Sequence, residues 1–246
     1  MTALLLLFLA GAAGGALNSV AGGGSCIVFP SLLFSGIAPV AANATTTVGL
    51  WPDGVASAAA YRRELPRDKS LGWLALASAA GGGIGAKLLL GTSDATFATL
   101  IPWLLLAASV VFTFGPRFTA RHGSARLPLA VGVGVQLLIS SYGGYFGGGM
   151  GILMLATYTL MGMVDIHAMN ALKVLLGVLI NGVAVVAFRV AGKVEIATAA
   201  PVAVGSVAGG FFGAAVARRV DPKHVRKLVL VLAWAMTAFF FYRTYR

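Results

Sequence analysis

The sequence of 246 residues has few of the side chains that carry chemistry in enzymes and metal sites. Its single cysteine, Cys26, excludes an internal disulfide, and its three histidines are too scattered for metal-ligand spacing. It contains no serine, histidine and aspartate set, and its glycine tracts lack the spacing and the lysine of a phosphate-binding loop. We therefore expect no enzyme activity, no cofactor and no metal ion.

Charge is also scarce, because charged residues make up 10% of the chain and hydrophobic residues 59%. This composition, with a mean hydropathy of +0.91, is typical of an integral membrane protein. The net charge is +11, but the basic residues stand in short segments between apolar runs. They indicate membrane topology and contact with lipid headgroups, and they argue against nucleic-acid binding. Residues 1–13 lack the basic start of a signal peptide, so we expect them to be retained.

Two glycine tracts interrupt the apolar runs, one at residues 22–24 and one at residues 147–149. Consecutive glycines weaken a helix interior, so we expect a helix break at each tract. Irregular backbone at membrane depth is tolerated where protein buries it or where it lines a cavity, and a matching pair of breaks indicates a transporter's binding site. The alternative is that the glycines only allow close helix packing.

The predicted fold is an all-α integral membrane protein with eight transmembrane helices in two repeated halves. The first and fifth spans are overlong and broken at the glycine tracts, so each fits either a tilted broken helix or a span with a half-helix. The expected spans cover residues 2–35, 40–60, 71–90, 95–114, 127–160, 166–188, 196–217 and 225–242.

The two halves match each other at a nearly constant offset, as a duplication requires. Asn43 matches Asn170 at an offset of 127, and the two tracts match at 125. We divide the chain into a first repeat at 1–116, a basic linker at 117–126 and a second repeat at 127–246. With four spans per half, both halves would enter from the same side, related by an axis along the membrane normal.

This arrangement also predicts an orientation. With both termini in the cytoplasm, the cytoplasmic loops would hold eleven basic residues and the opposite side six. The excess of basic residues favours cytoplasmic termini. This orientation assumes an even number of spans in each half. The assumption fails if a glycine-broken segment re-enters the membrane instead of spanning it.

The order of these features resembles the TauE/SafE sulfite exporter family of bacterial transporters over nearly the whole chain. A glycine-rich first span has Pro30 shortly after its tract, a threonine-rich second span closes with Tyr61 and two arginines, and the unit repeats from about Val131. The resemblance implies a secondary transporter of small sulfur-containing anions, such as sulfite or sulfonates, in the bacterial cytoplasmic (inner) membrane. The halves differ where Leu155 matches Pro30 and Lys173 falls at the threonine cluster, so we expect them to contribute unequally.

An anion inside a membrane must replace its hydration with hydrogen-bond donors, and a helix N-terminus supplies free N–H groups and a positive dipole end. The residues that follow each tract are placed to do this. The candidate substrate-binding residues are Gly22, Gly23, Gly24, Ser25, Asn43, Thr46, Gly147, Gly148, Gly149, Asn170 and Lys173. For Asn43 and Asn170 the alternative is a tie between helices.

Two charged residues lie deep in the predicted spans. Lys173 is about seven residues into its span, where a charge is costly and usually functional, and it shares a helix face with Asn170. Its alternatives are an ion pair with Asp53 or a span that starts later. Asp53 can be neutralised by burial, which suits proton coupling, or it can lie hydrated near an interface. Cys26 is expected to act as a small hydrophobic residue rather than as a reactive thiol.

The leading hypothesis is a transporter that exports small sulfur-containing or organic anions. Coupling of this transport to protons is one form of the hypothesis. The alternatives are a transporter or channel for another small solute, and a non-transporting membrane scaffold. The expected partners are a small anion and membrane lipid. The sequence does not decide between a monomer and a homo-oligomer.

Overall fold

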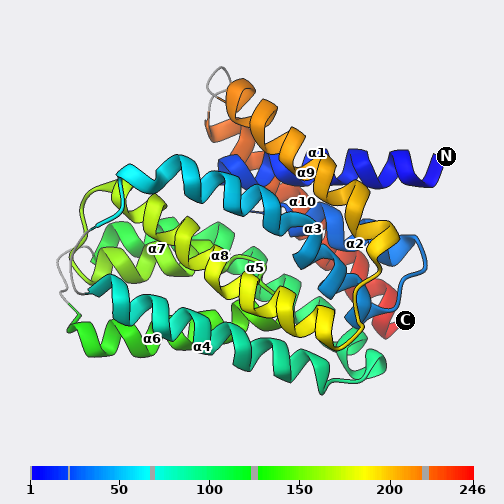
Figure 1. Ribbon diagram of the computed structural model, residues 1–246, viewed down its shortest axis with the longest axis horizontal. Helices are drawn as coiled ribbons and strands as arrows, with labels where there is room; N and C mark the ends of the chain where they lie inside the picture. The colour runs from blue at the N-terminus through cyan, green and yellow to red at the C-terminus, as the bar shows by residue number, and fades with distance from the viewer. Residues whose placement is uncertain (1, 22, 67–69, 123–126, 218–221) are drawn as a thin grey trace.

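The computed structural model describes residues 2–21, 23–66, 70–122, 127–217 and 222–246 (Figure 1). The described residues are helical, with no strand among them, so the all-α prediction is confirmed. The helices are α1 (Thr2–Ala21), α2 (Ser25–Phe34), α3 (Pro39–Ala60), the 3-10 helix η1 (Tyr61–Arg63), α4 (Ser70–Leu90), α5 (Asp94–His122), α6 (Leu129–Tyr145), α7 (Met150–Leu160), α8 (Ile166–Val190), α9 (Ile196–Ala217) and α10 (Pro222–Tyr245).

Both glycine tracts interrupt helices, as the sequence predicts. The first separates α1 from α2 and the second separates α6 from α7. Gly22 lies outside the described residues. The breaks therefore divide each overlong apolar segment into one helix of 17 or 20 residues and one of 10 or 11.

Each broken segment is a hairpin that returns toward the end where it began. At the open end of the α6–α7 hairpin, the Leu127 N–H donates to the Leu160 carbonyl over 2.7 Å. In the α1–α2 hairpin, Gly24 packs against the Gly14 carbonyl, and the Val28 side chain also reaches Gly14. The short helices α2 and α7 therefore run back along their longer partners.

Helix pairing across the halves gives the direction of each hairpin. Helices α1 and α9 run parallel, because Gly11 packs against Val202 and Gly15, four residues on, against Ser206. Helices α4 and α6 also run parallel, because Gly81 packs against Leu137 and Gly85, four residues on, against Ser141. Both chain termini lie at one end of the molecule (Figure 1), which we call the terminal end. We call the opposite end, where α5 ends and α6 begins, the linker end.

The hairpins enter from opposite ends, and this reverses the predicted relation between the halves. The α1–α2 hairpin opens at the terminal end and the α6–α7 hairpin at the linker end (Figure 1). Each hairpin is followed by three long helices, which is an odd number of passages between the ends. The expectation of two halves entering from the same side is therefore wrong, because each glycine segment returns instead of continuing. The observed order fits two halves of inverted topology.

The duplication itself stays a prediction, and two contacts agree with it. The Trp51 Nε1 group donates to the Val178 carbonyl over 3.1 Å, and the Ser109 and Thr237 hydroxyls lie 3.0 Å apart. These partners are 127 and 128 residues apart in the sequence, which is the offset between the halves. Residues near a two-fold axis contact their own counterparts, so the axis would pass between α3 and α8 and between α5 and α10.

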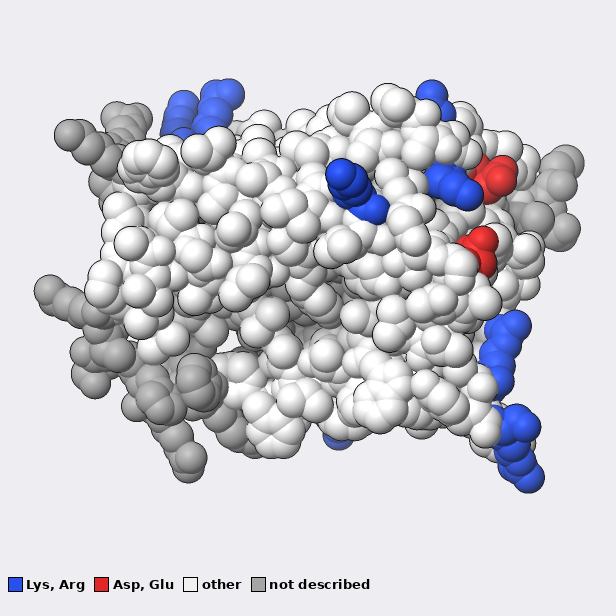
Figure 2. All heavy atoms as spheres, turned by 90° about the horizontal axis from the view of Figure 1, so that it is seen from below, with Lys and Arg blue, Asp and Glu red and all other residues white. Residues whose placement is uncertain are grey.

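The outer surface is apolar. Large hydrophobic side chains such as Leu138, Val204 and Phe211 are 72%, 64% and 75% exposed, and Figure 2 shows a broad uncharged surface between scattered charged side chains. Among the described residues, three helical segments are long and apolar enough to cross a membrane, at Ser70–Leu90, Asp94–Gly115 and Ile166–Val190. An extended exposed surface of this kind is suited to lipid.

The inverted order predicts which loops share a side of the membrane. In a Cys26→Ala background, single cysteines at Glu64 and Val164 should react with an impermeant maleimide from the same side, and a cysteine at Lys193 from the other. All three positions are exposed, and the first two lie at the linker end. Eight successive spans would instead group Glu64 with Lys193 and separate both from Val164. Labelling of intact cells and of inverted vesicles distinguishes the two patterns.

Candidate functional site

A cavity of about 250 Å³ lies where the tips of the two hairpins meet α3 and α8. Seven of the predicted binding residues line it, namely Gly23, Gly24, Ser25, Thr46, Gly147, Asn170 and Lys173. Asn43, Gly148, Gly149 and Asp53 are not among its lining residues, and Gly22 lies outside the described residues. Both glycine breaks therefore reach one cavity, although they are 125 residues apart in the sequence.

The second glycine tract is shaped by backbone conformation. Gly147 and Gly149 have φ of +83° and +78°, a left-handed region that favours glycine. The Tyr142 hydroxyl donates to the Gly148 carbonyl over 2.5 Å and fixes the turn. Gly148 and Gly149 thus shape the turn without lining the cavity.

The first tract requires glycine for a different reason. Gly24 has an ordinary helical φ of −56°, but a β-carbon at this position would overlap the carbonyl of Gly14. Glycine here allows α2 to begin directly against α1. The two tracts share a sequence pattern while meeting different steric requirements.

Lys173 lies beside the N-terminus of α7. Its Nζ donates to the Asn170 Oδ1 over 3.0 Å, and the side chain is half-buried. A β-carbon built on Gly151 would lie 3.2 Å from the Lys173 Cδ, so the lysine stem packs against the first turn of α7. The ammonium group and the positive end of the α7 dipole are therefore close together, and both favour an anion.

Asp53 is close to the cavity but lies behind its wall. Its side chain is 3% exposed and accepts a hydrogen bond from the Asn18 Nδ2 over 3.0 Å. Asn18 lines the cavity, so it separates Asp53 from the interior. The alternative of an Asp53 and Lys173 ion pair is not what the structure shows, because the hydrogen bond of Lys173 goes to Asn170.

The two matching asparagines differ in their contacts. The Asn43 Nδ2 donates to the carbonyl of Tyr145 over 3.0 Å and ties α3 to the end of α6. Asn170 faces the cavity and holds Lys173. A direct contact of Asn43 with substrate stays a prediction. Cys26 is buried and free, which fits a small hydrophobic residue.

Sequence reasoning missed several lining residues, including Asn18, Trp51 and Asn181. Asn18 is a polar residue within an apolar run, a few residues before the first tract, which is a usable signal. Trp51 lies four residues after Thr47 and three before Gly54, so these cavity-lining residues share a face of α3. Tryptophan is common in apolar cores, so its position alone did not indicate a cavity.

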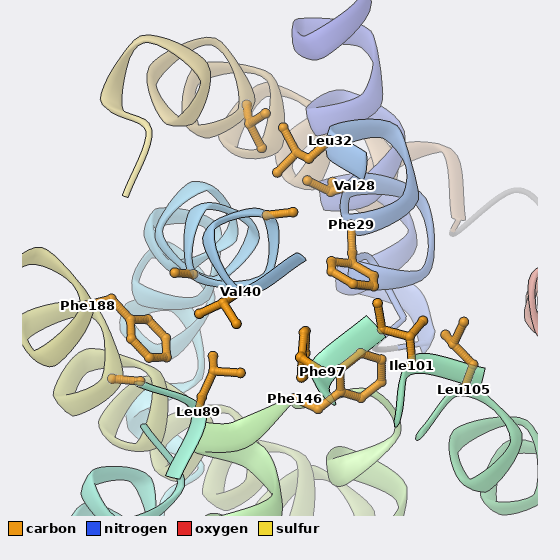
Figure 3. Close-up of a cluster of buried hydrophobic side chains, with 14 of the residues drawn as sticks. Val28, Phe29, Leu32, Val40, Leu89, Phe97, Ile101, Leu105, Phe146 and Phe188 are labelled. Atoms are coloured by element: carbon orange, nitrogen blue, oxygen red, sulfur yellow. The ribbon is translucent and has the colours of Figure 1, made fainter. Parts of the chain in front are cut away.

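Aromatic packing closes the cavity toward the terminal end. Phe29 of α2 meets Phe97 of α5 and Phe146 of the α6–α7 turn with ring centroids 6.4 and 5.8 Å apart (Figure 3). Phe146 belongs both to this cluster and to the cavity wall. In the other direction the lining follows α3 through Ser57 to Tyr61, at the linker end. The cavity therefore extends toward the linker end.

Comparison with known proteins gives a consistent result. The family model described as Sulfite exporter TauE/SafE matches residues 7–240. A probable membrane transporter protein of Haemophilus influenzae is 28% identical over 239 residues, covering 96% of this chain and 93% of that protein. Probable membrane transporter protein ORF9 of Sinorhizobium sp. is 31% identical over 172 residues, or 69% of this chain and 64% of that protein. No solved structure matches significantly.

Proposed function

The chain belongs to the TauE/SafE sulfite exporter family and is a membrane transporter, and from this premise we propose that it exports small sulfur-containing or organic anions. The observation that carries the proposal is the position of Lys173 at the N-terminus of α7, in a cavity bounded by both hairpin tips. Sulfite and sulfonates are the candidate substrates. The proposed location is the bacterial cytoplasmic membrane.

The physical basis is charge compensation at a site removed from bulk water. A half-buried ammonium group with a single amide oxygen as hydrogen-bond acceptor retains two donor hydrogens for a ligand. In the first turn of α7, the N–H groups of Met150 and Ile152 already donate to the Gly147 and Gly149 carbonyls, so α7 contributes chiefly the partial positive charge of its N-terminus. An oxyanion placed between them gains charge-assisted hydrogen bonds.

The distribution of basic residues supports a cytoplasmic linker end. Among the described residues, the helix ends and connecting segments at the linker end carry Arg62, Arg63, Arg117, Arg121, Lys223, Arg226 and Lys227. Those at the terminal end carry Lys87, Arg189, Lys193, Arg243 and Arg246. Because basic loops tend to stay in the cytoplasm, this distribution favours termini on the outer side, in place of the cytoplasmic termini that eight successive spans would give. Export would then load substrate from the linker end.

The closed aromatic cluster favours a carrier over an open channel. Phe29, Phe97 and Phe146 pack edge to face and leave the cavity extending in one direction. Release at the other end requires this packing to separate, which is the alternating access of a secondary transporter. A scaffold has no need for a polar cavity at the meeting point of two broken helices.

Replacing Lys173 tests the anion site directly. Lys173→Met removes the charge and keeps an unbranched side chain, so anion binding should weaken about ten- to hundredfold, the range expected for a charged hydrogen bond. Flux of sulfite and small sulfonates in proteoliposomes should fall accordingly. The matched control is Lys87→Met, an exposed lysine in the last turn of α4. Unchanged flux in a well-folded Lys173→Met protein would remove the lysine from the site.

Asp53 is the candidate proton carrier, because it is buried and connected to the cavity through Asn18. Asp53→Asn keeps an oxygen that can accept from Asn18 but removes the titrating group. We predict loss of anion accumulation driven by a pH gradient, with exchange of labelled anion at equal concentrations retained. The control is Asp165→Asn, which preserves a helix-capping side chain at the start of α8. A normal response of the Asp53→Asn protein to the gradient would disprove this coupling role.

A further inference from the structure

The cavity wall next to Lys173 is apolar along one side. Beyond the lysine, the lining residues of α8 are Val174, Gly177, Val178 and Asn181, so the apolar part of this wall ends at Asn181, and Trp51 of α3 contacts α8 at Val178. These residues lie three and four apart along α8 and therefore share one face of the helix. An anion held at Lys173 thus has an apolar surface on its side toward Trp51.

Trp51 is held in place by its surroundings. Its Nε1 group donates to the Val178 carbonyl over 3.1 Å, which joins α3 to α8. A β-carbon built on Gly182 would lie 3.4 Å from the same nitrogen, so the indole rests against the backbone of α8. The only polar atom of the ring is used in this bond, and the rest of the ring is apolar. Trp51 therefore contributes a fixed, flat hydrocarbon surface.

The dimensions of the cavity exceed those of a bare oxyanion. Its volume of about 250 Å³ equals roughly eight water molecules at about 30 Å³ each. Sulfite has four heavy atoms and would leave part of this space unfilled. Lys173 and Val178 are five residues apart on α8, or about 7.5 Å at a rise of about 1.5 Å per residue. That distance accommodates a short hydrocarbon chain.

From this arrangement, and resting on the proposed function, we propose that the site selects organic anions with a short hydrocarbon tail over inorganic oxyanions. The charged head binds at Lys173 and the first turn of α7, and the tail lies against Val174, Val178 and Trp51. Trp51 is the specificity-determining residue. Each methylene buried against this wall should improve affinity about fourfold, from about 0.8 kcal/mol per methylene.

A homologous series of ligands tests the tail site. The dissociation constants of sulfite, methanesulfonate, ethanesulfonate, propanesulfonate and butanesulfonate would be measured on the purified full-length protein. Affinity should rise about fourfold per methylene until the wall is covered, and sulfite should bind more weakly than ethanesulfonate. In Trp51→Ala the dependence on chain length should flatten, while methanesulfonate binding changes less than threefold. Trp51→Phe should keep most of the dependence.

A control variant and a second variant of the cavity wall accompany the Trp51 substitutions. Trp73→Ala removes an exposed indole outside the cavity and should leave the whole series unchanged. Val174→Thr introduces a hydroxyl into the same wall at nearly constant volume and should also flatten the series. The wild-type series and this variant keep the proposal testable even where Trp51→Ala does not fold.

The outcomes separate the tail site from the anion site. Equal affinity for sulfite and butanesulfonate, or an unaltered length dependence in Trp51→Ala, would overturn the tail site while leaving Lys173 as the anion holder. Absence of any anion binding to the wild-type protein, or unchanged binding in Lys173→Met, would instead overturn the proposed function. A steep series in the wild type that flattens only in the cavity variants supports the inference.

Discussion

The structure depends on how two non-helical turns are accommodated inside an apolar molecule. Backbone N–H and C=O groups at such depth must find partners or face a wet cavity. At the first turn, the Gly23 and Gly24 carbonyls accept from the N–H groups of Cys26 and Ile27. At the second, Tyr142 donates to Gly148. Gly23 and Gly24 of the first turn and Gly147 of the second line the same cavity, so the two turns that break the helices also bound the site.

The returning hairpins also explain the relation between the halves. A hairpin leaves the chain at the end from which it entered, and three long helices then carry it to the opposite end. The second half therefore starts inverted, and the tips of the two hairpins approach each other from opposite ends. Lys173, which the predicted duplication matches to the threonine cluster of the first half, gives the lining of the cavity its one lysine, on the side of the second half. The aromatic cluster around Phe29 makes the two ends of the cavity unequal as well.

Local chemistry in the sequence predicted the breaks, the membrane class and seven of the residues that line the cavity. It did not predict the inverted order, because an uncharged, mostly apolar segment such as residues 2–35 has the same hydropathy whether the chain continues or turns back. The bond between Leu127 and Leu160 closes the second hairpin, and no local pattern encodes it. The partner of Asp53 was missed for a similar reason, since Asn18 lies 35 residues away on another helix. Trp51 was missed because its orientation depends on packing between α3 and α8.

The central claim is that an anion binds between the hairpin tips at Lys173. The most direct measurement is a crystal structure of the full-length protein with 2-bromoethanesulfonate, using the anomalous signal of bromine to locate the ligand. The account predicts a single strong bromine peak inside the cavity, with the sulfonate oxygens about 2.7–2.9 Å from the Lys173 Nζ. A peak confined to the outer surface, with no ligand density between the glycine turns at saturating concentration, would contradict it.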